Sequence, residues 1–418
     1  MAPCINTRFL YIVLCIKITK ITYKSEKIIV ISQNLYAHPS PHMKFIVAPD
    51  AFKGSLSATQ AAEAIAEALR QAFPESTIVH LPVADGGEGT TEIVCAARGG
   101  QRMSCQSHNA VMQPITAHYA ILPDGTAVID MAAASGLTQI APAQRNPMHT
   151  TTFGTGEIIA HAITQGCHHI VVGLGGSATC DAGIGMLQAL GFTFYNAKGR
   201  RMHAPLCGKN MAAVYKIIDD RPYHLPAITF SAACDVTAHF CGHQGAAQLF
   251  AAQKGASPDE TMLLDHGLRH IAQLTAQERH IAIARLPRAG AAGGMGGIMT
   301  AYLNATLRSG IDWVLDTLHF DNTLANTDCV ITGEGCIDQQ SFNGKVLSGL
   351  LARTRQHHIR LLALGGCVVF DPHIADLTIH CITPAGMSTE EALNTQTAAK
   401  NLKNAIFSWS KTLEKQKA

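Results

Sequence analysis

The stretch Gly173–Leu187, which reads G-L-G-G-S-A-T-C-D-A-G-I-G-M-L, decides the fold. It follows the apolar, β-branched run His169–Val172 and leads into residues with helical spacing, so it predicts a strand, a glycine-rich turn and a helix. The first N–H groups of a helix lack backbone partners, and the helix dipole favours negative charge there. We therefore predict a phosphate-binding turn, with Asp181 available in it for metal or acid–base chemistry.

Strands and helices alternate on both sides of this stretch. Buried strands are predicted at 44–48, 77–83, 228–233, 328–332 and 361–364, and a capping box at Ser57 and Gln60 starts a helix after the first of them. This alternation is typical of a parallel sheet covered by helices. Between them, 111–119 and 126–131 read as antiparallel strands, which predicts an inserted domain of mixed β character.

The composition is that of a globular enzyme. The 418 residues are 47% hydrophobic and 15% charged, with a formal net charge of +2. Residues 1–42 hold five of the 32 basic and one of the 30 acidic residues, so the remainder carries 27 against 29, close to −2. No basic face is predicted, and nucleic acid is not an expected partner.

Residues 1–42 do not match the pattern that follows. Their apolar run Phe9–Ile16 is too short to span a bilayer, so no membrane partner is expected. A cleaner start lies at Met43, and we interpret residues 1–42 as a non-native or disordered extension. The thirteen cysteines lack metal-site spacing, and their odd number and irregular spacing favour reduced thiols in a cytoplasmic protein.

Most of the predicted strands end in glycine together with a carboxylate. The carboxylates are Asp50, Asp85 with Glu88, Asp181, Asp235, and Glu334 with Asp338, and lysines lie nearby at Lys53 and Lys345. In open α/β sheets, ligands bind beyond the carboxyl ends of the strands. Backbone N–H groups and lysines neutralise phosphate, one carboxylate holds Mg²⁺ and another accepts a hydroxyl proton in phosphoryl transfer. Each motif taken alone is also compatible with an ordinary turn or helix cap.

Two other phosphate-binding motifs are matched only in part. Gly173-x-Gly175-x-x-Ala178 fits the relaxed dinucleotide fingerprint, but the acidic residue expected about 20 positions later is replaced by Asn196–Gly199. A nicotinamide-dependent oxidoreductase stays open as an alternative. Gly344-Lys345 is not part of a Walker A loop, because it lacks the earlier glycine and is followed by Val346.

The chain from Met43 to the C-terminus resembles the type I glycerate kinases, bacterial enzymes that phosphorylate D-glycerate with ATP. The matching segments occur in order over nearly the whole body: A-P-D-A-F-K-G-S-L-S-A at 48–58, D-G-G-E-G-T at 85–90, M-A-A-A-S-G-L at 131–137, T-T-F-G-T-G-E at 151–157, G-L-G-G-S-A-T at 173–179, A-C-D-V-T at 233–237, A-G-A-A-G-G at 289–294 and I-T-G-E-G at 331–335.

The resemblance implies a fold and a function. The fold is α/β: a flavodoxin-like or Rossmann-like domain built from both chain ends, expected at 43–108 plus 289–418, with a second α/β domain at 109–288 inserted. The reaction implied is phosphorylation of D-glycerate to 2-phospho-D-glycerate, with ATP and Mg²⁺ as cofactors, in a cleft between the domains of a cytoplasmic protein. A homodimer is the candidate assembly.

We expect Asp181 and Asp235 near the transferring phosphoryl group, one as base and one as Mg²⁺ ligand, with Lys53 as a further catalytic residue. The residues expected to bind substrate or phosphate are Asp50, Asp85, Glu88, Gly175, Gly176, Ser177, Gly293, Gly294, Glu334 and Lys345.

The chain departs from the family pattern at several positions. Cys180 and Ala182 stand where Asn and Gly are usual, Ala238 and His239 where Asn-Pro is usual, and Cys336 where Arg is usual. The loss of amide and guanidinium donors predicts weaker binding by one to a few kcal/mol. These departures keep a non-catalytic sugar-acid-binding protein as a second alternative.

Overall fold

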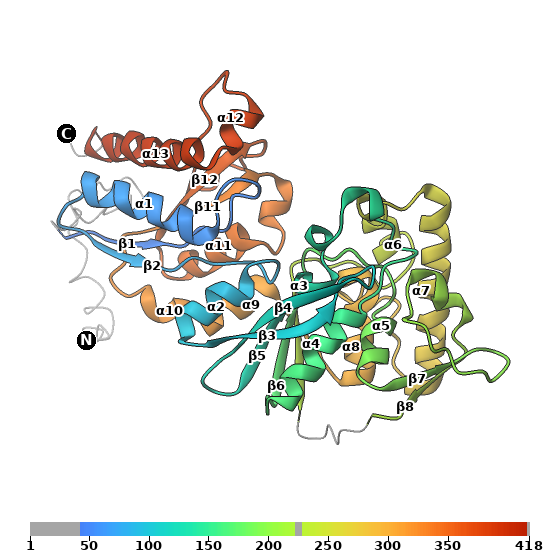
Figure 1. Ribbon diagram of the computed structural model, residues 1–418. Coiled ribbons are helices and arrows are strands. Elements are labelled where there is room, and N and C mark those ends of the chain that lie inside the picture. The colour runs from blue at the N-terminus through green and yellow to red at the C-terminus, as the bar shows by residue number, and fades with distance from the viewer. Residues whose placement is uncertain (1–41, 222–227, 416–418) are drawn as a thin grey trace, which may run out of the picture. The chain divides into compact units, whose positions relative to one another are not determined.

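The computed structural model describes residues 42–221 and 228–415 (Figure 1). The extension predicted at residues 1–42 lies outside the described residues, except for His42. None of the helices within the described ranges is long and apolar enough to cross a membrane.

Segments from near the two ends of the described chain form a parallel five-stranded sheet. Its strand order is β13-β12-β11-β1-β2, and every neighbouring pair is parallel. The strands are β1 (Lys44–Val47), β2 (Thr77–His80), β11 (Cys329–Ile337), β12 (Arg360–Val368) and β13 (Leu377–Cys381). The short, apolar β1 lies between β2 and β11, and the roughly 250 residues from the end of β2 to the start of β11 leave this sheet and return to it.

Helices cover both faces of this sheet. On one face α1 (Ala58–Ala72) and α13 (Thr395–Lys415) pack over β1 and β12, with Phe45, Ile65 and Leu402 buried between them (Figure 1). On the other face α11 (Val346–Gln356) packs over β11. The predicted capping box is confirmed, because Gln60 N donates to Ser57 Oγ at 3.2 Å and Ser57 N donates back to Gln60 Oε1 at 2.9 Å.

The middle of the chain forms a mixed six-stranded sheet. Its order is β10-β9-β6-β5-β4-β3; the pairs from β10 to β5 are parallel and the β5–β4–β3 meander is antiparallel. The strands are β3 (Gln101–His108), β4 (Pro114–Ile121), β5 (Thr126–Asp130), β6 (His169–Gly173), β9 (Thr229–Cys234) and β10 (Thr306–Ser309). β3 is a largely polar strand at the sheet edge, and the hydrophobic pattern of the sequence did not predict it.

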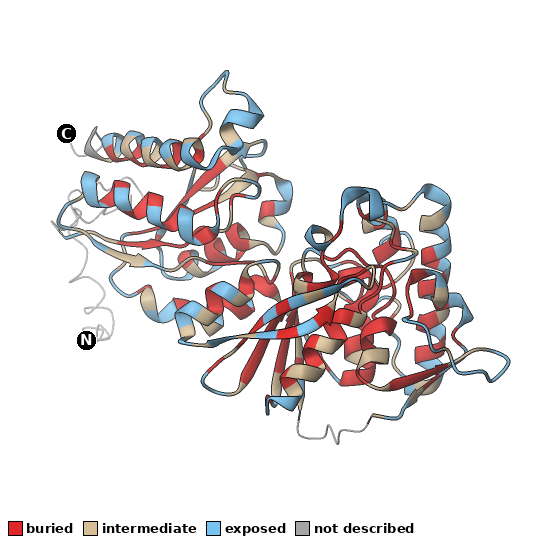
Figure 2. Ribbon diagram, in the orientation of Figure 1, coloured by how far each residue is buried: buried red, intermediate tan, exposed pale blue. Residues whose placement is uncertain are grey.

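Side chains of this sheet alternate between two apolar clusters, as a pleated strand requires. Ile170 and Val172 of β6 face the large core under α4 (Phe153–Thr164), α5 (Ile184–Ala189) and α8 (Met295–Leu303). Val171 faces the opposite cluster, which contains α2 (Thr90–Arg98) and α9 (Gly310–Thr317). That second cluster also contains Ile46 of the five-stranded sheet, so the two sheets share the α2–α9 layer. Figure 2 shows this buried interior against the exposed outer helix faces.

The remaining elements are shorter or peripheral. They are α3 (Ala132–Ser135), α6 (Ala246–Phe250), α7 (Pro258–Arg279), α10 (Phe320–Thr323), α12 (Thr389–Leu393), and the antiparallel pair β7 (Phe192–Tyr195) and β8 (Lys216–Asp219).

The predicted α/β class with parallel sheets is confirmed. The chain from His42 onward is one compact unit by its internal contacts, so the domain boundaries predicted at 108/109 and 288/289 stay predictions. The six-stranded sheet draws its two edge strands, β3 and β10, from the segments that were expected to form the other domain.

The prediction that the cysteines are reduced is wrong at one pair. Cys336 and Cys367 form a disulfide with a Cα–Cα distance of 4.5 Å. They stand directly opposite each other on the parallel strands β11 and β12, a register that the sequence does not reveal. The nine other cysteines in the described ranges are free.

Candidate active site

Close backbone contacts between glycines bring several strand ends together. A Cβ on Gly86 would lie 2.9 Å from Gly310 Cα, and one on Gly173 would lie 2.5 Å from Gly86 O. The loop after β2 therefore fits between the end of β6 and the start of α9 only because these positions have no side chain. This packing places Asp85 at the junction of the two sheets.

Four carboxylates gather around this junction, and we call them the acidic cluster. They are Asp50 after β1, Asp85 after β2, Asp235 after β9 and Glu334 within β11. Burial first, and then the charge of Asp85, raise the pKa of Asp50 to about 7 and that of Asp235 to about 6. Burial raises the pKa of Glu334 as well, and Asp85 adds to the effect. The cluster therefore holds groups that exchange protons close to neutral pH.

Two lysines face the acidic cluster. The charge of Lys53 lowers the pKa of both Asp50 and Asp235, and Lys345 does the same to Asp235 and Glu334. Lys345 stands at the N-cap of α11, next to Gly344, where a Cβ would approach Asp235 O to 3.1 Å. The structure thus brings together Asp50, Asp85, Asp235, Glu334, Lys53 and Lys345, all of which the sequence analysis selected.

Asp181 lies in a different environment from this cluster, and its expected role as base or Mg²⁺ ligand stays a prediction. Its side chain is wholly buried, with 0% exposure. Its Oδ2 accepts hydrogen bonds from Thr152 N and Thr152 Oγ1, both at 2.8 Å, and its Oδ1 accepts one from Gly183 N at 3.0 Å. Burial raises the pKa of Asp181, and these donors oppose the rise. The carboxylate fastens its own loop to the start of α4.

The predicted anion site in the turn before α5 stays a prediction, and two of the N–H groups at the start of that helix have partners within the protein. Asp181 accepts the Gly183 N–H, and Thr152 Oγ1 accepts the Met186 N–H at 2.9 Å, so these donors already have partners inside the protein. The helix is also only six residues long. The earlier part of the loop remains accessible, because Gly176 is exposed and Ser177 retains 8% exposure.

Gly293 and Gly294 are buried against this loop, and their predicted part in phosphate binding stays a prediction. A Cβ on Gly293 would lie 2.3 Å from Thr179 O, and one on Gly294 would lie 3.0 Å from Ala182 Cα. Ala182 itself has a φ of +56° and donates its N–H to Gly293 O at 3.0 Å. A left-handed backbone explains why glycine suits position 182, and alanine there costs about 1 kcal/mol.

Glu88 lies at the rim of the site. It is exposed, and its one hydrogen bond among the described residues comes from Thr138 Oγ1 at 3.5 Å. The neighbouring loop is held by Asp130, at the end of β5, which the sequence analysis missed. Asp130 accepts from Gly89 N at 3.0 Å and from Thr91 Oγ1 at 2.8 Å, and burial raises its pKa to about 7. Asp130 is also a carboxylate at the carboxyl end of a strand, so the reasoning that selected the other carboxylates applies to it as well.

Two cations near the site were also missed. Arg288 donates to Cys234 O at 2.9 Å, beside Asp235. Lys254 is buried and donates to Ser177 Oγ at 2.7 Å. Neither is close in sequence to the residue that it contacts, and no motif marks either position.

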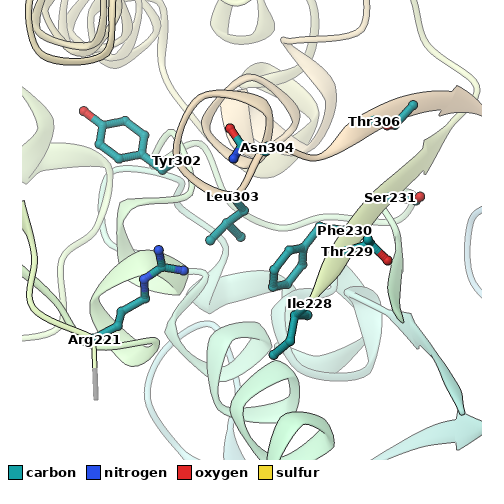
Figure 3. A pocket seen from close by; sticks show the side chains of 9 residues that line it. All are labelled: Arg221, Ile228, Thr229, Phe230, Ser231, Tyr302, Leu303, Asn304 and Thr306. Atoms are coloured by element: carbon teal, nitrogen blue, oxygen red, sulfur yellow. The ribbon is translucent and has the colours of Figure 1, made fainter. Parts of the chain in front are cut away.

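A cavity of about 420 Å³ lies elsewhere, around the starts of β9 and β10 (Figure 3). Its lining includes Ile228, Phe230 and Leu303 and contains no carboxylate. The cavity lies at the amino ends of these parallel strands, whereas the acidic cluster lies at their carboxyl ends. This cavity is therefore not part of the candidate site.

The described residues contain no group of three or more His, Cys, Asp or Glu side chains arranged to hold a metal ion. A closed protein cage for a metal is therefore absent from the part of the chain that the structure describes. Mg²⁺ is usually held by one or two carboxylates together with substrate phosphates. The crowded pair Asp50 and Asp85 fits that open arrangement, because a dication would relieve the repulsion that raises the pKa of Asp50.

Comparison with known proteins identifies close relatives. A sequence model of the glycerate kinase family matches residues 45–414. Glycerate kinase of Bacillus cereus is 39% identical over 372 residues, which cover 86% of this chain and 97% of the relative. Glycerate 2-kinase of Escherichia coli is 38% identical over 355 residues, which cover 83% and 93%. A crystal structure described as that of a glycerate kinase 2 from Salmonella typhimurium matches with a TM-score of 0.77 and 37% identity, over 90% of this chain and 99% of that one.

Proposed function

This chain belongs to the glycerate kinase family, and we propose that it transfers the γ-phosphoryl group of ATP to the 2-hydroxyl of D-glycerate, giving 2-phospho-D-glycerate and ADP. The observation that carries the proposal is the acidic cluster, in which proton-exchanging carboxylates lie between two lysines. The oxidoreductase and the non-catalytic binder gain no support from the relatives.

Asp235 is the general base of this proposal. Its pKa of about 6 leaves it ionised at neutral pH while keeping it basic enough to accept a hydroxyl proton as that oxygen attacks. The substrate oxygen forms a bond to the γ-phosphorus, the bond to the β-phosphate oxygen breaks, and ADP leaves. Lys53 and Lys345 flank Asp235 and neutralise charge on the phosphate oxygens while the phosphoryl group is transferred.

Asp50 and Asp85 are the residues that would hold Mg²⁺ together with the nucleotide phosphates. When bound, the ion neutralises charge on the phosphate oxygens. The charge of Lys345 lowers the pKa of Glu334, and in this proposal Glu334 holds the ammonium group of Lys345 toward the phosphates. Asp181 has a structural role in this proposal, because its oxygens accept hydrogen bonds from Thr152 and Gly183.

A homodimer and a cytoplasmic location stay predictions. The location was inferred from reduced thiols, and the Cys336–Cys367 bond weakens that inference.

The test is phosphorus NMR of the product made from ATP and D-glycerate. A phosphate on the 2-oxygen couples to one carbon-bound proton and gives a doublet, whereas one on the 3-oxygen couples to two and gives a triplet. The doublet supports the proposal. A triplet assigns the other hydroxyl, and the absence of any phosphoglycerate would contradict the kinase activity with this acceptor.

A further inference from the structure

Lys254 is a buried cation directly behind the glycine-rich loop, and the mechanism above does not use it. It ends the 3₁₀ helix η6 (Ala252–Lys254) and is 3% exposed. Its Nζ donates to Ser177 Oγ and to Thr179 O, both at 2.7 Å. Gly255 follows with a φ of +97°, where a Cβ would approach Arg145 O to 2.1 Å, so the backbone at this point is closely fitted.

The charge of Lys254 is not balanced by an ion pair in the described part of the chain. Salt bridges there involve other residues, and the oxygens of Asp181, which raises the pKa of Lys254, accept hydrogen bonds from Thr152 and Gly183. Burial lowers the pKa of Lys254 to about 8, so the ammonium is still mostly charged at neutral pH. A buried cation without a paired anion is costly unless it serves a nearby negative group.

The contact with Lys254 fixes what Ser177 can do. An ammonium group only donates hydrogen bonds, so Ser177 Oγ must accept from it. The hydroxyl hydrogen of Ser177 is then directed elsewhere, and the described residues provide no acceptor for it. Ser177 is polarised by the cation and keeps partial access to solvent beside Gly176.

The same loop adjoins the acidic cluster. A Cβ on Gly175 would lie 2.5 Å from Gly87 Cα, and Gly87 N donates to Asp85 Oδ1 at 3.0 Å. An anionic group bound at Ser177 would therefore lie next to the loop that carries Asp85.

We propose that Lys254 is a positioning residue that holds Ser177 as a hydrogen-bond donor to an oxyanion of a substrate. The oxyanion is either the carboxylate of the acid or a phosphate of the nucleotide, which share the same chemistry. The inference rests on the proposed function of the site and adds to it a donor pair that lies outside the acidic cluster.

The test compares Lys254→Met, Ser177→Ala and the double variant with Lys198→Met, an exposed lysine in a surface turn, as control. Both single variants should raise the KM of the same substrate by about tenfold or more, because each removes a charge-assisted hydrogen bond, with kcat changed much less. A raised KM for D-glycerate identifies the carboxylate, and a raised KM for ATP identifies the phosphate. The double variant should be no worse than Lys254→Met, because the two residues act as one unit.

Other results would overturn the inference. If Lys254→Met only lowers the melting temperature and leaves both KM values within twofold of the control, the lysine merely supports the fold. Additive effects in the double variant would mean that the residues act separately. If Lys254→Met does not fold, Ser177→Ala decides alone, since an unchanged KM for both substrates contradicts a donor role.

Calorimetric titration separates this inference from the proposed reaction. D-Glycerate and ATP are each titrated into the wild type and Ser177→Ala without turnover. If the wild type binds one of them and the variant binds it about tenfold more weakly, the inference stands even where phosphoglycerate is not formed. Equal binding by the two proteins contradicts it whether or not the wild type is an active kinase.

Discussion

Asp181 and Asp235 follow neighbouring parallel strands, β6 and β9, yet they reach opposite environments. Asp235 comes directly after the last residue of β9 and lies in the acidic cluster. Asp181 lies well beyond the end of β6 and turns into the core, where its carboxylate accepts three hydrogen bonds from Thr152 and Gly183. A carboxylate after a strand is thus available for chemistry when it lies directly at the sheet edge and few hydrogen-bond donors of the protein occupy its oxygens.

The largest expected effect is on turnover in Asp235→Asn. The amide cannot accept the hydroxyl proton, so kcat should fall by about a hundredfold or more while the melting temperature changes little. Coupled measurement of ADP release with D-glycerate checks this. Asp259→Asn, at an exposed position in the first turn of α7, is the control. Near-normal kcat in Asp235→Asn would place the base elsewhere in the acidic cluster.

Asp181→Asn should show the reverse pattern. The amide of Asn has an NH₂ group in place of one carboxylate oxygen, so some of the donors of Thr152 and Gly183 would lose their acceptor inside the protein. The free energy of unfolding should therefore fall by about 3 kcal/mol. Chemical denaturation measures the loss, and kcat of the folded fraction should stay within a few-fold of the wild type. If the variant is fully stable but inactive, the contrast between the two aspartates fails.

The pH dependence tests the acidic cluster as a unit. Because the pKa values of Asp50 and Asp235 are raised to about 7 and about 6, the folded state binds more protons than the unfolded chain between about pH 4 and 7. Stability should therefore fall as the pH rises through this window, while kcat/KM rises as Asp235 ionises.

Asp85→Asn sharpens this pH test, because Asp85 raises the pKa of both groups. Removing its charge should move the midpoint of the pH–rate profile down by about one unit. Melting temperatures from pH 5 to 8 and the pH profile of kcat/KM are the measurements. An unshifted midpoint would show that the carboxylates do not interact.

The smallest effect is expected for Glu88→Gln. The side chain is exposed and has one long hydrogen bond, so either KM should change by less than about fivefold. Initial-rate kinetics at varied ATP and D-glycerate check this, with Asp235→Asn as the contrasting variant. A larger change would move Glu88 from the rim into the binding site.

Strands and site residues could be predicted from the sequence where the local hydrophobic pattern and the sheet topology agree. Apolar runs predicted β1, β6 and β9. Strand-end glycines predicted the meeting of Asp50, Asp85, Asp235 and Glu334, because the carboxyl ends of parallel strands share an edge.

Prediction failed where a long-range contact decides. The direction of Asp181 depends on Thr152, 29 residues away, and the contact of Lys254 with Ser177 joins residues 77 positions apart. Neither periodicity nor motif spacing carries information about such pairs.

The disulfide between Cys336 and Cys367 makes a covalent ring of the intervening segment, which contains Lys345 and all of α11. A protease that cuts once within 337–366 would therefore leave two fragments that migrate together until a thiol reductant is added. The lysine beside Asp235 is carried on a closed loop whose two ends cannot separate, even when its peptide backbone has been broken.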